Sequence, residues 1–167
     1  MELKNSQFTI IQNELKSTPL LPWEMVKKLL WDLEIDVFAD LEKVAITNNW
    51  HFKYFIDGFT HFKGYSVVLT DHNLNICVAS SNIESMTGYN SQEIIGQKPS
   101  LLQGRDTDEN CKFLLKIAID EEVPFNSRLI NYRKNGDAYG CEIHAFPIYN
   151  GSGSLSHYIA FENEYYV

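Results

Sequence analysis

Two β-rich segments, residues 125–133 and 139–149, flank the dipeptide Asn135-Gly136. Asn and Gly both tolerate the positive φ angles that a tight turn between antiparallel strands requires, so this pattern predicts a β-hairpin. A third β-rich segment, residues 155–164, follows a Gly-Ser-Gly turn. The C-terminal part of the chain is therefore predicted to form three consecutive strands of one antiparallel sheet.

The segments before the hairpin predict two more strands, followed by helices. Residues 66–71 and 75–80 are β-rich and enclose an Asp-His-Asn turn. Next, the sequence predicts a short helix over residues 82–86 and a longer one over residues 107–122. The order of two strands, helices and three strands predicts an α+β fold, namely a five-stranded antiparallel sheet with helices on one face.

Capping residues mark the expected helix ends. Gly88 is suited to close the first helix in the left-handed conformation. Asn90 and Glu93 have the spacing of a capping box, so a new helix is expected to begin there. A second box, beginning at Asp106, is expected to open the longer helix, which Pro124 ends.

A helical pattern occupies the chain before residue 60. Apolar residues recur there at helical spacing in two groups: Trp23, Val26, Leu30 and Leu33, then Val37, Leu41, Val44 and Ala45. Two amphipathic helices within residues 22–47 follow from this spacing, and such helices need a surface to pack against. We therefore divide the chain into an N-terminal helical extension, residues 1–60, and a second domain, residues 61–167.

Charge and composition exclude several classes of protein. The net charge is −8 and no part of the chain is strongly basic, so we expect no nucleic-acid partner. No apolar run is longer than five residues, whereas a membrane-spanning helix needs about 20. Three cysteines without a CxxC pair favour reduced thiols and a cytoplasmic location.

Three motifs resemble a known family. They are Thr87-Gly88-Tyr89, the segment Gly-Gln-Lys-Pro-Ser-Leu-Leu-Gln-Gly at residues 96–104, and Asn-Tyr-Arg-Lys-Asn-Gly at residues 131–136. In this order and spacing they resemble the PAS sensory domain, most closely its flavin-binding LOV branch. The resemblance covers residues 66–164. It implies a sheet curled around a small cavity and a role in signalling.

The resemblance also implies which residues face that cavity, and several depart from the LOV pattern. Gln103 and Asn131 match two flavin-holding amides, whereas Lys98, Cys141 and Glu162 replace three others. Pro99 stands where LOV photoreceptors carry the cysteine that forms the flavin adduct, and Ser100 and Lys116 replace the phosphate-holding arginines. An ionised Glu162 would set acceptor against acceptor at a flavin carbonyl. No resident cofactor is therefore expected, with FMN or FAD as the alternative. The cavity candidates are Lys98, Gln103, Asn131, Cys141 and Glu162.

The hairpin register decides whether these candidates share a face. A two-residue turn at Asn135-Gly136 would pair Asn131 with Gly140. The LOV arrangement instead needs Asn131 and Cys141 on the same face, which requires a loop of odd length or a bulge. The apolar alternation at Cys141, Ile143 and Ala145 favours the second arrangement.

Strand alternation also predicts an apolar patch on the opposite, outer face of the sheet. Its members, and our candidates for an interface, are Ile130, Tyr132, Phe146, Ile159 and Phe161. Leaving such a patch in water is unfavourable, so something should cover it. An amphipathic helix from residues 22–47 or the same face of a second copy could do so. We expect a homodimer through this surface.

These observations favour a sensory module that acts by ligand- or partner-dependent protein–protein interaction, with a signalling protein as a possible partner. The alternative is a flavin photosensor or redox sensor without the adduct cysteine. An enzyme is not expected, because no nucleophile–base pair, phosphate loop or metal-ligand spacing occurs. Residues 107–122 hold no histidine for a haem. A protein that signals in trans and a piece of a longer chain both fit the sequence.

Overall fold

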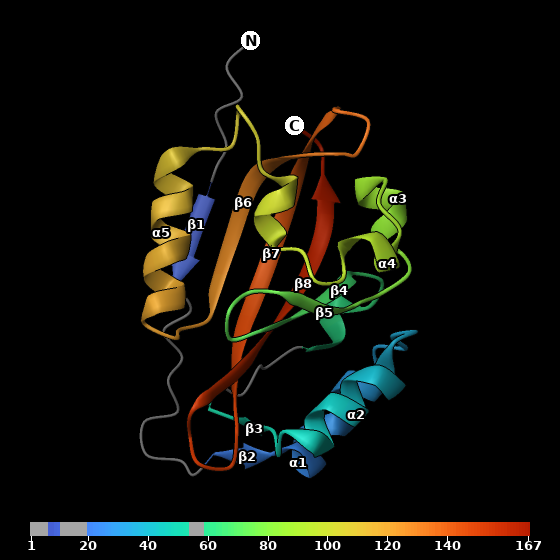
Figure 1. Cartoon of the computed structure of the whole chain (residues 1–167), viewed down its shortest axis with the longest axis vertical. Helices are drawn as coiled ribbons and strands as arrows, with labels where there is room; N and C mark the ends of the chain where they lie inside the picture. The colour runs from blue at the N-terminus through green and yellow to red at the C-terminus, as the bar shows by residue number, and fades with distance from the viewer. Residues whose placement is uncertain (1–6, 11–19, 54–58) are drawn as a thin grey trace.

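The computed structural model describes residues 7–10, 20–53 and 59–167. Its central sheet has the strand order β6-β7-β8-β4-β5, and every neighbouring pair is antiparallel (Figure 1). The predicted five-stranded sheet is thus confirmed. The strands are β4 (Ser66–Asp71), β5 (Ile76–Ala79), β6 (Phe125–Tyr132), β7 (Ala138–Tyr149) and β8 (Leu155–Tyr165).

The hairpin between β6 and β7 has a loop of odd length. Tyr132 pairs with Ala138, which leaves residues 133–137 in the loop, and Asn131 pairs with Tyr139. Gly136 lies at φ +92°, in the left-handed region that Gly adopts without strain. Because Leu129 pairs with Cys141, Asn131 and Cys141 point to the same face, as the alternation predicted.

Short helices and one longer helix cover the inner face of the sheet. They are α3 (Ile83–Thr87), α4 (Ser91–Ile94), the 3-10 helix η2 (Pro99–Leu102) and α5 (Glu109–Asp120). Gly88 closes α3 at φ +75°, and Asn90 and Glu93 form the predicted capping box of α4. The predicted cap of α5 is wrong by two residues. Asp108 caps that helix by accepting from the backbone N–H of Cys111 at 2.7 Å, because Asp106 is bonded to Tyr132 instead.

The N-terminal extension contains the two predicted helices and three short strands that were not predicted. The helices are α1 (Trp23–Trp31) and α2 (Phe38–Thr47), and a 3-10 helix, η1 (Phe59–Phe62), follows the extension's last strand. The strands are β1 (Gln7–Ile10), β2 (Leu21–Pro22) and β3 (His51–Phe52). β1 pairs with the edge of β6, and β3 joins β2 to β7.

The extension covers the outer face of the sheet. Phe146, Ile159 and Phe161 belong to one buried cluster with side chains of α1, α2 and η1. The ring of Phe161 stacks on that of Phe62 with centroids 4.4 Å apart, and Trp50 Nε1 donates to Nδ1 of His157 on β8 at 3.2 Å. Figure 1 shows α1 and α2 below the sheet, whereas α5 lies at its left edge. Of the two covers considered, the chain's own helices occupy this surface.

A candidate ligand cavity on the inner face of the sheet

A cavity of about 410 Å³ lies between the inner face of the sheet and the helices η2 and α5. This volume falls in the range of small-molecule binding sites, about 300–1,000 Å³. Its walls are mostly apolar, and Leu102, Leu115, Leu129 and Ile143 contribute to them. Strand alternation explains the wall, because every second residue of β4, β6, β7 and β8 points to this face.

Four of the five predicted cavity residues line this space. Lys98 and Gln103 do so from the two ends of η2, Asn131 from β6 and Glu162 from β8. Cys141 does not line the cavity. It is buried behind Glu162, with its Sγ 3.8 Å from Oε2 of that carboxyl group.

The carboxyl group of Glu162 is almost completely buried. The residue is 5% exposed, and among the described residues the thiol of Cys141 is the one group that donates to its oxygens. Burial raises the pKa of Glu162 to about 7, and the thiol hydrogen bond opposes that rise. Burial, with the nearby Glu162, also raises the pKa of Cys141 well above its ordinary value, so this thiol is not an activated nucleophile.

Two further polar atoms of the cavity wall lack partners. Asn131 Oδ1 and Thr70 Oγ1 are buried and make no hydrogen bond to any described residue. Buried polar side-chain atoms are normally satisfied by protein, water or a ligand, so two such atoms in one cavity suggest that a ligand completes them. Sequence reasoning missed Thr70. The alternation of Ser66, Val68 and Thr70 along β4 was the signal that could have found it.

Lysines surround the more open part of the cavity. Lys98, Lys112 and Lys116 line it together with one acidic residue, Asp120. Lys112 is held by Glu109 at 2.8 Å. The excess of positive charge at this rim favours ligands with an anionic group.

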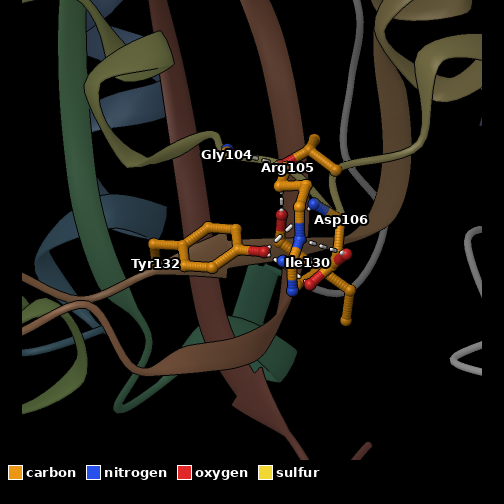
Figure 2. A network of polar contacts seen from close by, with 6 residues as sticks. Gly104, Arg105, Asp106, Ile130 and Tyr132 are labelled. Atoms are coloured by element: carbon orange, nitrogen blue, oxygen red, sulfur yellow. Dashed lines mark hydrogen bonds and ion pairs between the residues drawn. The ribbon is translucent and has the colours of Figure 1, made fainter. Parts of the chain in front are cut away.

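A polar network holds the loop between η2 and α5 against the end of β6 (Figure 2). Tyr132 donates its hydroxyl to Asp106 Oδ2 at 2.6 Å and accepts from the backbone N–H of Asp106 at 3.0 Å. Thr107 Oγ1 donates to the carbonyl of Ile130 at 2.6 Å. A Cβ at position 104 would overlap the ring of Tyr132, so Gly104 permits this close approach. The network fixes the segment that carries Gln103 into the cavity.

The predicted interface residues do not form one exposed patch. Phe146, Ile159 and Phe161 are 3%, 1% and 0% exposed under the extension. Ile130 is also buried, and Tyr132 bends toward the loop at Gly104 rather than joining the outer-face cluster. Strand alternation gave the directions of the first three side chains, but it could not show that the same chain covers them.

Two groups of the cavity wall, Pro99 and Glu162, differ from those of the flavin-binding LOV pattern. Pro99 lines the cavity and offers no thiol for an adduct. The buried wall presents the carboxyl group of Glu162 and the free oxygen of Asn131, both acceptors when Glu162 is ionised. An ionised Glu162 facing a flavin carbonyl would set two acceptors against each other.

Residues 64–164 match the family described as PAS domain. The chain belongs to the PAS family. A blue-light-activated histidine kinase of Brucella ovis is 34% identical over 85 residues, which are 51% of this chain and 17% of the kinase. A blue-light photoreceptor of Listeria innocua is 37% identical over 92 residues, which are 53% of this chain and 36% of the photoreceptor. The chain thus aligns with only a small part of each relative.

Solved structures agree with this PAS assignment. The LOV domain of a blue-light-activated histidine kinase from Erythrobacter litoralis superposes with a TM-score of 0.59 at 20% identity, covering 62% of this chain and 98% of that domain. An RNA-binding light-oxygen-voltage receptor superposes with a TM-score of 0.65 at 18% identity, covering 96% of this chain and 38% of the receptor. At these identities the structures establish the fold. The predicted resemblance to the LOV branch is confirmed by these relatives and structures together.

Neither a membrane span nor a metal cluster occurs in the part of the chain that the structure describes. No helix there is both long and apolar enough to cross a bilayer. No three His, Cys, Asp or Glu side chains gather there as a group able to hold a metal ion.

Proposed function

We propose that this PAS domain senses a small molecule in its inner cavity and passes the signal to another protein through the N-terminal extension. One observation carries the proposal. The cavity holds unpartnered buried polar atoms on one face of the sheet, and the extension packs on the other face. A ligand that satisfies those atoms would contact strands that also support the extension.

Strand β8 links the two faces most directly. Glu162 points into the cavity, and Phe161, the residue before it, points into the cluster under the extension. Successive residues of a strand point to opposite faces, so a shift of the backbone at Glu162 also moves Phe161 against Phe62. Closely packed interfaces respond to such shifts by changing between discrete arrangements.

The output is proposed to be a change in protein–protein contact. Movement of α1 and α2 would expose the apolar side chains Phe146, Ile159 and Phe161, which suit a second copy of the chain or a signalling partner. We propose that a homodimer forms only after α1 and α2 have moved, since this surface is covered in the structure. We propose no catalytic step for the chain.

Extraction of the native protein tests the sensing step. Protein purified without denaturation is analysed by native mass spectrometry, then denatured, and the released small molecules are identified. We expect one bound molecule per chain, and its loss in Ala160→Phe, which places a ring in the cavity. Ala118→Ser, a change in a buried residue that does not line the cavity, serves as the control. Release of nothing, or equal retention by Ala160→Phe, would contradict the proposal.

A flavin-binding sensor without an adduct is the second candidate. Two facts favour it: Gln103 and Asn131 both line the cavity, and the relatives named above are blue-light receptors. The absorption spectrum of the purified protein separates the two candidates. A flavin spectrum in stoichiometric amount would support the second candidate, whereas a colourless protein with another bound molecule would support the first.

A further inference from the structure

The buried wall of the cavity is rich in acceptors. Glu162 offers two carboxyl oxygens, Asn131 contributes an unpartnered Oδ1, and Thr70 adds an unpartnered hydroxyl oxygen. Among the described residues, the side chain of Glu162 accepts one hydrogen bond, from the thiol of Cys141, and at 3.8 Å this bond is weak. The lysines belong to the rim, where Lys98 and Lys116 are exposed. When Glu162 is ionised, a ligand that fits the buried end is favoured if it brings donors to this carboxylate.

A carboxylate recognises a particular pattern of donors. Its two oxygens can accept two parallel hydrogen bonds from neighbouring N–H groups in one plane, and such charge-assisted pairs are stronger than neutral ones. A ring nitrogen that carries hydrogen, next to an exocyclic amino group, has this pattern. A ring with carbonyl groups on both sides of its N–H instead places acceptors against the carboxylate.

We propose that the cavity selects a heteroaromatic ligand with a 2-amino-4-oxopyrimidine edge, as in pterins and guanine, and that Glu162 reads this edge. The inference rests on the proposed ligand-sensing function and adds the chemical class of the ligand. The apolar side chains Leu102, Leu115, Leu129 and Ile143 line the same cavity and supply surface for a flat ring. Asn131 Oδ1 provides a further acceptor for the amino group.

A matched pair of probes tests the assignment. Pterin and lumazine are fluorescent bicyclic rings that differ only at position 2, where pterin has an amino group and lumazine an oxo group. Each is titrated with the full chain, with Glu162→Gln and with Glu164→Gln, and binding is followed by the change in probe fluorescence. Glu164 is on the same strand but outside the cavity, and it pairs with Arg133 at 2.5 Å.

We expect the wild-type protein and Glu164→Gln to bind pterin at least about tenfold more tightly than lumazine, the equivalent of about 1.4 kcal/mol. Glu162→Gln should abolish or reverse the preference, because an amide can donate to the oxo group. Equal affinity for the two probes in the wild type, or an unchanged preference in Glu162→Gln, would overturn the inference. So would the failure of both probes to bind. In that case native mass spectrometry still decides the sensing function separately.

The pH dependence gives a readout that a purely structural role would not produce, and it needs only the wild-type chain if Glu162→Gln fails to fold. The ionisable groups around Glu162 are Cys141 and Tyr139 on β7, Glu164 with its partner Arg133, and the rim residues Lys98, Lys112, Lys116 and Asp120. Because the carboxylate form accepts the donors, pterin binding should weaken as the pH falls from about 7.5 to about 5.5, on the acid side of a carboxyl group shifted by burial. Affinity that does not change over this range would contradict the role of Glu162.

Discussion

Replacing Phe161 with alanine tests whether the buried cluster on the outer face of the sheet is part of the folded core. Phe161 is fully buried, stacks on Phe62 with centroids 4.4 Å apart, and meets Phe146 at 6.2 Å in an edge arrangement. Removing a buried Phe side chain usually costs about 3–5 kcal/mol, which combines the lost transfer free energy with that of the cavity left behind. The two ring contacts with Phe62 and Phe146 place this site well inside that range.

We therefore expect the free energy of unfolding of Phe161→Ala to fall by about 4 kcal/mol, a large part of the roughly 5–15 kcal/mol that a domain has. For a chain of this size the midpoint of thermal unfolding should fall by about 8–16 °C. Urea unfolding followed by tryptophan fluorescence is a suitable assay. Trp23 and Trp50 lie in the same buried cluster as Phe161, so their emission reports on its loss.

Phe113→Ala is the matched control, because Phe113 on α5 is 63% exposed. It should change the free energy of unfolding by less than about 0.5 kcal/mol. A loss below about 1 kcal/mol in Phe161→Ala would refute the reasoning, since a fully buried aromatic ring cannot be removed at so small a cost. It would mean that the outer-face cluster around Phe161 is not closely packed in solution.

Three more predictions follow from the cavity and its supporting loop. Gly104→Ala should lower the free energy of unfolding by about 1–3 kcal/mol in a urea titration, because its methyl group meets the ring of Tyr132. Tyr132→Phe should cost about 1–2 kcal/mol through its two hydrogen bonds with Asp106 and should increase amide hydrogen exchange in the loop; unchanged exchange would contradict the bracing role. In the folded chain burial raises the pKa of Glu162 from 4.5 to about 7, so the unfolded chain releases this proton first and stability falls as the pH rises through that window. Relative to that of Glu162→Gln, the free energy of unfolding of the wild type should fall by on the order of 3 kcal/mol between about pH 4.5 and pH 7. If the difference in unfolding free energy between the two proteins stays constant over this range, the carboxyl group is not desolvated.

The sequence predicted those parts of the fold that local patterns control. The bounds of β4 agree with the predicted strand, and the capping chemistry at Gly88 and Asn90 is as expected. The cap of α5 was misplaced because Asp106 and Asp108 offer the same chemistry two residues apart. The choice between them depends on Tyr132, which lies far along the chain.

Contacts between residues far apart in the chain could not be predicted from the sequence. The pairing of β1 with β6 joins residues more than 100 positions apart, and nothing in a four-residue strand identifies its partner. The exclusion of Cys141 from the cavity has the same origin. Its direction followed from alternation, but its depth behind Glu162 depends on how β7 and β8 pack.

The differences between this chain and the LOV pattern all concern chemistry and not architecture. Gly88, Asn90 and Gly104 shape turns and close approaches, and the structure uses each of them as the fold requires. Lys98, Pro99 and Glu162 instead face the cavity, where they replace two amides and the reactive thiol of the LOV pattern. These replacements leave the scaffold intact and change only the groups that line the cavity. An ionised Glu162 would repel a flavin carbonyl but would accept hydrogen bonds from a ligand that brings N–H donors, so the protonation state of this one buried group separates the two candidate ligands.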